Sequence, residues 1–311
     1  MIPFFTDMNT NMKIIDEINR LKKEKDAIIL AHNYQIDEVQ DIADYVGDSL
    51  GLSIKASEVK NKVIVFCGVR FMAETAKILN PLKTVLLPDK TAGCPMADMI
   101  TAEDVVELKK KHPEAIVVCY VNSTAEVKAN VDICCTSANA VKVVSSIPKD
   151  REVIFIPDKY LGSYVQSQTG RKMILWHGYC PTHAFIDAKS IMQMKKDHPG
   201  AEVLVHPECN SEVIKTADKV LSTGGMLKYA HESSSNEFII GTEIGIIYRL
   251  KKQNPKKIFY PAKNNIICPN MKLINLEKIM WSLEDNIYEV ILPDDIIKKA
   301  RSSLERMKEF V

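Results

Sequence analysis

Three Cys-Pro pairs recur at a nearly constant interval along the chain. They begin at Cys94, Cys180 and Cys268, so the intervals are 180 − 94 = 86 and 268 − 180 = 88 residues. The chain has 8 cysteines and 14 prolines among its 311 residues, and chance would place roughly 0.4 such pairs in a sequence of that composition. Three pairs in register therefore indicate a repeated unit that carries one cysteine in each copy.

Three thiolates from separate loops could bind one metal centre. With a fourth donor they could hold zinc, and His183 is close enough to Cys180 in sequence to be considered. They could equally hold a 4Fe-4S cluster, in which three cysteines leave one iron free to bind substrate as a Lewis acid. A single Cys-Pro pair is more typical of a buried turn. The shared register favours a metal site over three unrelated turns.

A polar pair ends an apolar segment in each unit, 62, 58 and 62 residues before the next Cys-Pro pair; these pairs are His32-Asn33, Asn122-Ser123 and His206-Pro207. Open α/β sheets bind ligands at the carboxyl ends of their strands, so we expect these polar residues to share one central cavity. Tyr34 and Glu208 lie close by and add acid-base groups. Hydroxyl groups at predicted helix starts could bind phosphate or carboxylate, although such residues are also ordinary helix caps: Ser49, Ser137, Ser222 and Thr223.

The other five cysteines have a different sequence context. Cys67, Cys119, Cys134 and Cys135 lie within apolar runs, where cysteine behaves as a small hydrophobic residue. Cys209 follows a polar segment near an expected strand end, but it lies outside the repeat. We therefore expect five cysteines in the core or beside it, and three as metal ligands.

Short apolar runs alternate with helical patterns, which is typical of βαβ units with parallel sheets. Strands are predicted at Ala27–His32, Lys62–Gly68, Thr84–Leu87, Ala115–Val121, Glu152–Ile156, Lys172–Trp176, Ala201–His206, Glu237–Gly241 and Lys257–Tyr260. Helical spacing predicts helices at Phe71–Leu79, Ala138–Val144, Glu243–Lys252 and about Pro293–Phe310. Ser123 with Glu126 has the form of a capping box and predicts one more helix start.

The repeat predicts three homologous Rossmann-like α/β domains around a pseudo-threefold axis, with a central active site. We matched a second apolar stretch followed by small residues in each unit: FCGVRFMAE, ICCTSANAV and VLSTGGMLK. The expected boundaries are residues 1–100, 101–188 and 189–311, with a C-terminal helix added to the third unit.

Composition narrows the class of protein. Lys and Arg number 41 against 40 Asp and Glu, and no basic surface for nucleic acid is evident. No apolar run reaches membrane-spanning length, and the first residues lack the pattern of a secretory signal. We therefore expect a cytoplasmic protein with neither a nucleic-acid nor a membrane partner.

Several long segments resemble the quinolinate synthase family (quinolinate synthetase A). They occur in order between Ala31 and Lys272: AHNYQIDEVQDIADYVGDSL, PDKTAGCPMAD, YVNSTAEVKANVDICCTSANA, HGYCPTHAF, VHPEC, STGGM, IGTEIG and CPNMK. The resemblance implies three homologous α/β domains and one 4Fe-4S cluster bound by Cys94, Cys180 and Cys268. It also implies condensation of iminoaspartate with dihydroxyacetone phosphate to quinolinate in NAD biosynthesis, with loss of phosphate and two waters.

The resemblance also implies roles for individual residues. Tyr34 and Glu208 match positions implicated in proton transfer, and His32 is included with them as a candidate catalytic residue. Substrate and intermediate binding is implied for His32, Ser49, Tyr120, Val121, Asn122, Ser137, His206, Pro207, Glu208 and Thr223. Iminoaspartate is unstable, so functional coupling to an aspartate-oxidising enzyme is expected. The segment from Leu227 to Glu237 is the least family-like part of the third unit, and its role stays open.

Two other functions remain as alternatives. A zinc hydrolase could use the three cysteines with His183, and it would be colourless where an iron-sulfur protein is brown. An iron-sulfur electron carrier or sensor would usually shield its cluster with four ligands. A cluster with an open iron, facing a cavity lined by His32, Asn122 and His206, favours catalysis.

The division of the cysteines gives the first prediction. Cys94→Ala, Cys180→Ala and Cys268→Ala should each lose the full 4Fe-4S cluster and activity, because two thiolates cannot fix a cluster that already lacks a fourth protein ligand. Alanine at positions 67, 119, 134 or 135 should keep the brown colour at a cost of at most a few kcal/mol, and we expect the same of Cys209→Ala. Iron and sulfide analysis measures this. Full iron and full activity in any of the first three variants would exclude the threefold ligand set.

Overall fold

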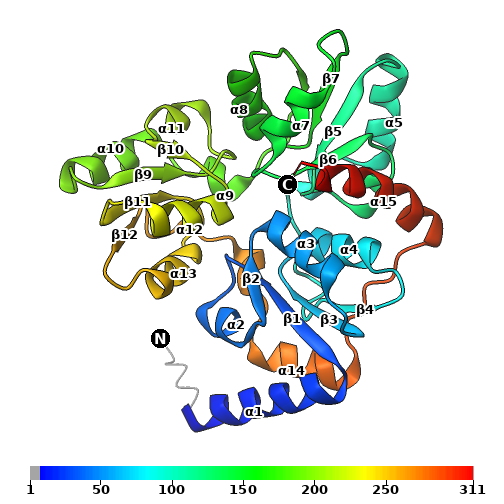
Figure 1. The fold of residues 1–311 in the computed structure, drawn as a ribbon, viewed down its shortest axis with the longest axis vertical. Coiled ribbons are helices and arrows are strands. Elements are labelled where there is room, and N and C mark those ends of the chain that lie inside the picture. Colours follow the sequence, from blue (N-terminus) through cyan, green and yellow to red (C-terminus); the bar gives the residue numbers. More distant parts are fainter. Residues whose placement is uncertain (1–7, 311) are drawn as a thin grey trace.

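The computed structural model describes residues 8–310, which form three α/β units around a common centre (Figure 1). Each unit contains one four-stranded parallel sheet. The inner strands are continuous apolar runs, and every residue of β3 (Val63–Cys67) and β7 (Val153–Ile156) is buried. Such runs are typical of parallel strands with helices on both faces. The expected class of three Rossmann-like α/β domains is confirmed.

The first unit begins with α1 (Met8–Glu24) and then alternates strands with helices. Its elements are β1 (Ala27–His32), α2 (Asp37–Ile42), β2 (Tyr45–Gly47), α3 (Ser49–Glu58), β3, α4 (Arg70–Leu79), β4 (Thr84–Leu86) and the short 3₁₀ helix η1 (Ala97–Met99). The second unit repeats this order with α5 (Ala102–Lys111), β5 (Ile116–Tyr120), α6 (Ala125–Lys128), β6 (Ile133–Cys135), α7 (Ala140–Ser146), β7, α8 (Lys159–Thr169), β8 (Ile174–Leu175) and α9 (Pro181–Ala184).

The third unit has the same order and is followed by two further helices. It contains α10 (Ala188–Asp197), β9 (Glu202–Val205), α11 (Ser211–Lys215), β10 (Lys219–Val220), α12 (Thr223–Glu232), β11 (Glu237–Gly241), α13 (Ile246–Gln253), β12 (Ile258–Pro261) and the 3₁₀ helix η2 (Pro269–Lys272). The last two helices are α14 (Leu276–Asp285) and α15 (Asp294–Lys308).

All three sheets share one strand order, in which the first strand lies between the second and the third. The orders are β2-β1-β3-β4, β6-β5-β7-β8 and β10-β9-β11-β12. The second strand of each unit therefore pairs on one side of the first strand, and the third strand pairs on the other side. The connections diverge at this point, which creates a crevice at the carboxyl ends of the strands. The three crevices face the centre of the molecule, and this topology places the strand-end residues there.

One hydrogen bond fixes the same pairing in every unit. Asp44, Asp132 and Asp218 each accept a hydrogen bond from a backbone N–H fifteen residues earlier, those of Ile29, Val117 and Val203, at 2.7–2.8 Å. In each case the aspartate's own N–H donates to the carbonyl of that same earlier residue. The carboxylate thus joins the segment before the second strand to the first strand. These contacts give the structural register of the repeat, with intervals of 117 − 29 = 88 and 203 − 117 = 86 residues.

The sequence prediction found nine of the twelve strands and missed the same strand in each unit. The missed strands are β2, β6 and β10, which have only two or three residues each. Two local predictions were also wrong. The counterpart of ICCTSANAV and VLSTGGMLK is YVGDSLGLS at the end of β2, whereas FCGVRFMAE belongs to β3 and α4. Also, Thr124 and not Ser123 caps α6, because the Thr124 hydroxyl accepts the Val127 N–H.

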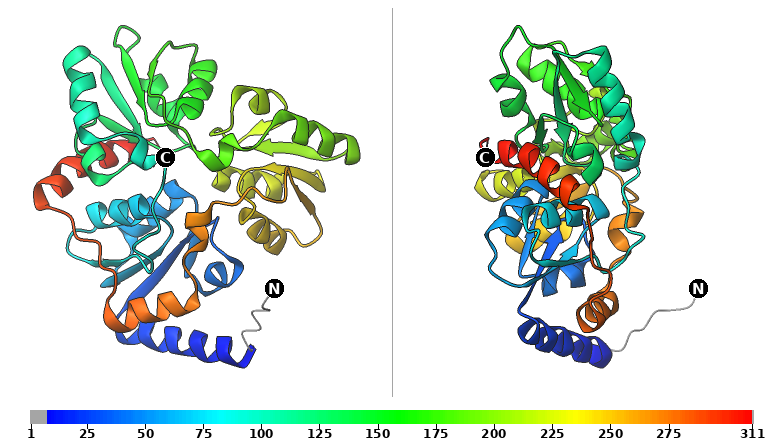
Figure 2. Two further views of the ribbon diagram at one scale, coloured as in Figure 1. Left: turned by 180° about the vertical axis from the view of Figure 1, so that it is seen from behind. Right: turned by 90° about the vertical axis from the view of Figure 1, so that its right-hand side faces the viewer.

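The last two helices hold the units together. α14 packs against α1, and α15 lies across β6, α6 and α4, where it connects the second unit to the first (Figure 2). The boundaries at residues 100/101 and 188/189 stay predictions. Within residues 8–310, no helix combines the length and apolar character needed to cross a membrane.

The repeated aspartate gives the second prediction. Asp132→Ala should lower the free energy of unfolding by about 1–3 kcal/mol, because it leaves the N–H of the buried Val117 without a partner. Denaturant unfolding measures the change, and Asp150→Ala on an exposed turn is the control. A loss below about 0.5 kcal/mol at position 132, as for an ordinary surface substitution, would show that the carboxylate is dispensable.

Candidate active site

A cavity of about 170 Å³ lies where the three units meet. Strand-end loops, helix starts and Cys-Pro loops from every unit contribute to its wall. Twelve of the candidate residues line it: His32, Tyr34, Ser49, Cys94, Tyr120, Asn122, Ser137, Cys180, His206, Glu208, Thr223 and Cys268. Val121 and Pro207 do not line it; both are buried beside residues that do.

The lining residues fall into equivalent positions of the repeat. Ile29, Val117 and Val203 are equivalent positions of the three units. Three residues after them come His32, Tyr120 and His206, respectively. The residue five positions later is Tyr34, Asn122 or Glu208, and the helix-start position holds Ser49, Ser137 or Thr223. Our placing of Asn122 with the two histidines was therefore wrong by two residues, because β5 ends at Tyr120. The backbone positions repeat while the chemistry of their side chains differs.

The helix starts of the first and third units are held together. Asp48 caps α3 by accepting the Gly51 N–H at 2.8 Å, and it also accepts the hydroxyl of Ser222 at 3.1 Å. Ser222 in turn caps α12. Asn33 donates to the Thr223 hydroxyl at 3.0 Å. Ser49 and Thr223 are thereby fixed at the N-terminal ends of two ten-residue helices, where the helix dipole favours anionic ligands.

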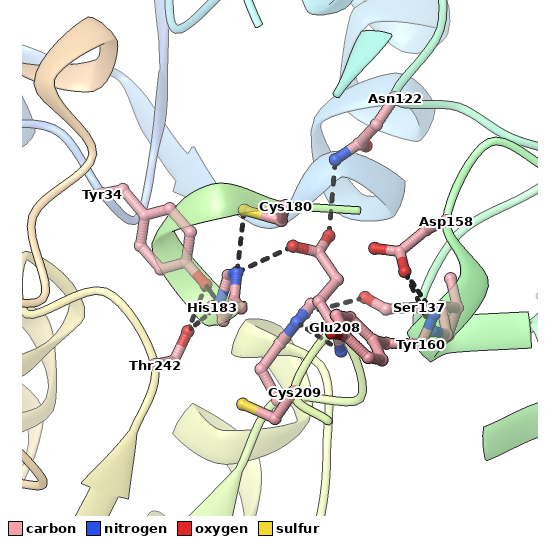
Figure 3. Close-up of polar contacts among 12 residues, drawn as sticks. Tyr34, Asn122, Ser137, Asp158, Tyr160, Cys180, His183, Glu208, Cys209 and Thr242 are labelled. Atoms are coloured by element: carbon pink, nitrogen blue, oxygen red, sulfur yellow. Dashed lines mark hydrogen bonds and ion pairs between the residues drawn. The ribbon is translucent and has the colours of Figure 1, made fainter. Parts of the chain in front are cut away.

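A continuous chain of polar contacts connects Glu208 to Tyr34 (Figure 3). The Glu208 carboxylate lies 2.7 Å from His183 Nδ1. His183 Nε2 lies 2.8 Å from the Thr242 hydroxyl, which is 2.5 Å from the Tyr34 hydroxyl. If Nδ1–H donates to Glu208, then Nε2 accepts from Thr242, and Thr242 accepts from Tyr34. All four groups are buried.

Glu208, in the third unit, is held as a carboxylate by donors from the second unit. Burial alone would raise its pKa, but His183 and the hydrogen bonds from His183 and Tyr120 outweigh burial, and the pKa is lowered. Tyr120 donates to Glu208 at 2.5 Å, and Asn122 Nδ2 lies 3.4 Å away. Burial, and then the charge of Glu208, raise the pKa of Tyr34 and Tyr120 well above the usual range. Both phenols therefore remain protonated beside an ionised base.

His32 and His206 are neutral, with a defined tautomer. Burial lowers the pKa of each to about 3. His32 Nδ1 accepts the N–H of Tyr34, and His206 Nδ1 accepts the N–H of Glu208. Nδ1 is therefore the unprotonated nitrogen, and Nε2 carries the proton. His206 Nε2 contacts Ser137 Oγ at 3.2 Å.

The cavity wall includes one cysteine from each Cys-Pro pair: Cys94, Cys180 and Cys268. Burial raises the pKa of all three thiols, and that of Cys94 reaches about 12. In residues 8–310, one group of three ligand atoms lies within 4.8 Å, and it consists of Cys180, His183 and Glu208. The three sulfurs do not gather so closely. A tetrahedral zinc ion needs its sulfurs roughly 3.8 Å apart, given Zn–S bonds of about 2.3 Å. Cys180, His183 and Glu208 could together hold a metal ion.

The remaining cysteines have structural surroundings. Cys67, Cys119, Cys134 and Cys135 are fully buried within strands. Cys209 is also buried, and its thiol lies 3.6 Å from the carbonyl oxygen of Gly241.

Several residues in or beside the site were not predicted from the sequence. His183 was considered only as a zinc ligand, and Thr242, Glu243 and Asp158 were not selected. Thr242 and Glu243 directly follow β11, and Asp158 lies two residues after β7. The strand-end argument was applied only to the first strand of each unit. Applied to the third strand as well, it would have found these residues.

Comparisons with known proteins agree on one family. Residues 16–309 match the family model described as Quinolinate synthetase A protein. Relatives named quinolinate synthase include one from Dehalococcoides mccartyi strain CBDB1, 56% identical over 96% of this chain and 98% of the relative. Another is from Thermodesulfovibrio yellowstonii, at 54% over 95% and 97%. The relative from Pyrobaculum aerophilum is 51% identical over 95% and 99%.

The neutral histidines give the third prediction. Their pKa is lower in the folded protein than the ordinary value of 6.5, so the unfolded chain binds more protons below pH 6.5. Stability should therefore fall as the pH drops from 6.5 to 4.5, by up to about 1.4 kcal/mol per pH unit for each histidine. His206→Asn should reduce this slope in denaturant unfolding of the metal-free protein. His231→Asn, at an exposed position, should not; equal slopes in all three proteins would contradict the assignment.

Proposed function

The chain belongs to the quinolinate synthetase A family, and from that membership we propose that it condenses iminoaspartate with dihydroxyacetone phosphate to form quinolinate for NAD biosynthesis. Phosphate and two waters would be lost. The observation that carries this proposal is the buried chain from Tyr34 through Thr242 and His183 to Glu208. It places a carboxylate base and a protonated phenol in one cavity, joined by a path along which protons can move.

The reaction requires several proton transfers and no net oxidation. Iminoaspartate and dihydroxyacetone phosphate together contain the atoms of quinolinate, phosphate and two waters, so no oxidant or reductant is consumed. Removing water requires a base at carbon and an acid at the departing hydroxyl. We assign the base to Glu208 and the acid to Tyr34, since their protonation states fit these tasks. His32 would donate a hydrogen bond through Nε2 to a substrate oxygen.

We assign binding of the anionic substrate mainly to the other polar residues of the cavity wall. Hydroxyls at helix starts can meet carboxylate or phosphate oxygens, and neutral histidines can donate to them. The proposed binding set is His32, Ser49, Tyr120, Val121, Asn122, Ser137, His206, Pro207, Glu208 and Thr223. Val121 and Pro207 lie behind the lining, so their place in this set rests on the family resemblance alone.

The proposed cofactor is one 4Fe-4S cluster held by Cys94, Cys180 and Cys268. When bound, it would supply one iron without a protein ligand as a Lewis acid for a substrate oxygen. One Cys-Pro cysteine from each unit lies in the cavity wall, which supports a shared cluster. The redox-neutral balance of the reaction supports the Lewis-acid role over an electron carrier.

The setting of the reaction is part of the proposal. Thiolate ligands favour a reducing compartment, so we propose a cytoplasmic location. The small-molecule substrates are iminoaspartate and dihydroxyacetone phosphate. Because iminoaspartate is short-lived, an aspartate-oxidising enzyme would have to supply it nearby.

One experiment tests the proposal as a whole. Protein purified without oxygen should be brown, contain about four irons and four sulfides per chain, and form quinolinate from the two substrates. A colourless, active protein containing zinc would support the hydrolase alternative instead. A brown protein without synthase activity would instead support the alternative of an iron-sulfur electron carrier or sensor.

The fourth prediction concerns the base. Glu208→Gln should keep the fold and the cluster but lose most turnover, because an amide can form hydrogen bonds but cannot exchange a proton. We expect about 10²–10⁴-fold lower kcat, the usual contribution of general acid-base catalysis. Glu107→Gln on the exposed face of α5 is the control. Parental turnover in the Glu208 variant would limit Glu208 to binding.

A further inference from the structure

Glu243 is a fully buried carboxylate that contacts a cluster-ligand loop. It lies in the turn between β11 and α13, immediately after Thr242. Its Oε2 accepts the Gly245 N–H at 2.8 Å, which closes the turn, and its Oε1 accepts the Cys268 N–H at 3.2 Å. One carboxylate therefore fixes both the turn that carries Thr242 and the backbone of a proposed cluster ligand.

Lys272 connects the same carboxylate to Tyr34. Its Nζ lies 3.0 Å from Glu243 Oε1 and also donates to the backbone carbonyl of Tyr34. The lysine is at the end of η2, four residues after Cys268. The Glu243–Lys272 ion pair thus joins three segments: the turn after β11, the Cys268 loop, and the loop after β1.

The space around this ion pair is filled. A Cβ at Gly245 would lie 2.7 Å from Lys272 Nζ, 2.8 Å from Glu243 Oε2 and 2.9 Å from the Tyr34 carbonyl oxygen. The Gly245 carbonyl accepts from Gln40 Nε2 at 3.0 Å, and Gln40 also donates to the carbonyl of Gln35 at 2.9 Å. A glycine is required here because the loop of the first unit approaches the turn so closely.

We propose that Glu243 and Lys272 are positioning residues, whose ion pair sets the Tyr34 hydroxyl and the Cys268 thiol relative to each other. The inference rests on the proposed function for the meaning of Tyr34 and Cys268. The Tyr34 hydroxyl contacts Thr242. The Tyr34 backbone carbonyl accepts a hydrogen bond from Lys272, which is paired with Glu243, the residue directly after Thr242. A displaced ion pair would therefore move the phenol and the cluster ligand together.

General stabilisation is a weaker explanation for this ion pair. Moving two charged groups out of water costs free energy that their attraction seldom exceeds. Buried ion pairs therefore add little net stability to a fold. The same two units are also joined by Lys252 and Asp41, an exposed pair at 2.5 Å that touches neither segment of the site. Lys252→Met is therefore the matched control for loss of a lysine between these units.

The first test needs neither cluster nor substrate. A single Lys272→Met change would leave an unpaired buried carboxylate, so the test uses Glu243→Gln with Lys272→Met, and separately Gly245→Ala. In metal-free protein, amide hydrogen exchange should quicken at least about tenfold at Cys268 in both variants, and at Gly245 in the double variant. Lys252→Met should leave these amides unchanged. Parental protection in a folded double variant would overturn the proposal.

The second test uses the protein loaded with cluster. Both variants should release iron to a chelator about 10–100-fold faster and show kcat lowered by about the same factor, with KM changed less, as for residues that orient a metal ligand. The single variant Lys272→Arg should show smaller changes in iron release and kcat than the double variant, because it keeps a cation beside Glu243. Parental iron release and kcat would overturn the proposal even if amide exchange changed. An inactive parent would contradict the proposed function, while iron release and amide exchange would still test the ion pair.

Discussion

The burial of one ionised carboxylate at the meeting point of three units constrains the rest of the structure. An unpaired charge in such a place would cost several kcal/mol, so Glu208 must receive donors. They come from His183 and Tyr120 of the second unit, while Glu208 belongs to the third. His183 is then tied through Thr242 to Tyr34 of the first unit. The units cannot shift relative to one another without leaving this charge unpaired.

The threefold repeat explains how such a site can be built from similar parts. Tyr34, Asn122 and Glu208 occupy one backbone position and supply a phenol, an amide and a carboxylate. The shared topology sets where each side chain enters the cavity, and the differences among the units set its chemistry. A symmetric ring of three carboxylates would repel itself, and three phenols would offer no base. Catalysis at this position therefore requires that the repeat be broken in its side chains.

Much of this arrangement could be predicted from sequence, because it follows from periodic features. Long apolar runs predicted nine strands, and the Cys-Pro interval predicted the three units. Length alone does not explain why β2, β6 and β10 were missed, because β4 and β8 are equally short and were predicted. The pairing of the missed strands depends on Asp44, Asp132 and Asp218, whose role appears only in the folded chain. Without these strands the register within the repeat slipped, and Asn122 was matched to the wrong residues. The pairing of Glu208 with His183 joins different units, so no local pattern could indicate it.

Under the proposed function, the cavity must also receive an anionic substrate beside a carboxylate that is already ionised. Two features of the fold reduce that conflict. Ser49 and Thr223 begin helices in the first and third units, so the helix dipoles and hydroxyls offer positive potential from the wall. Burial lowers the pKa of His32 and His206 and keeps them neutral, and backbone N–H groups that donate to Nδ1 leave Nε2–H as the donor. Charged histidines would bind anions more strongly, but they would also neutralise Glu208 as a base. In the proposed reaction the site would therefore bind substrate through dipoles and neutral donors, and the carboxylate would keep the charge that proton removal requires.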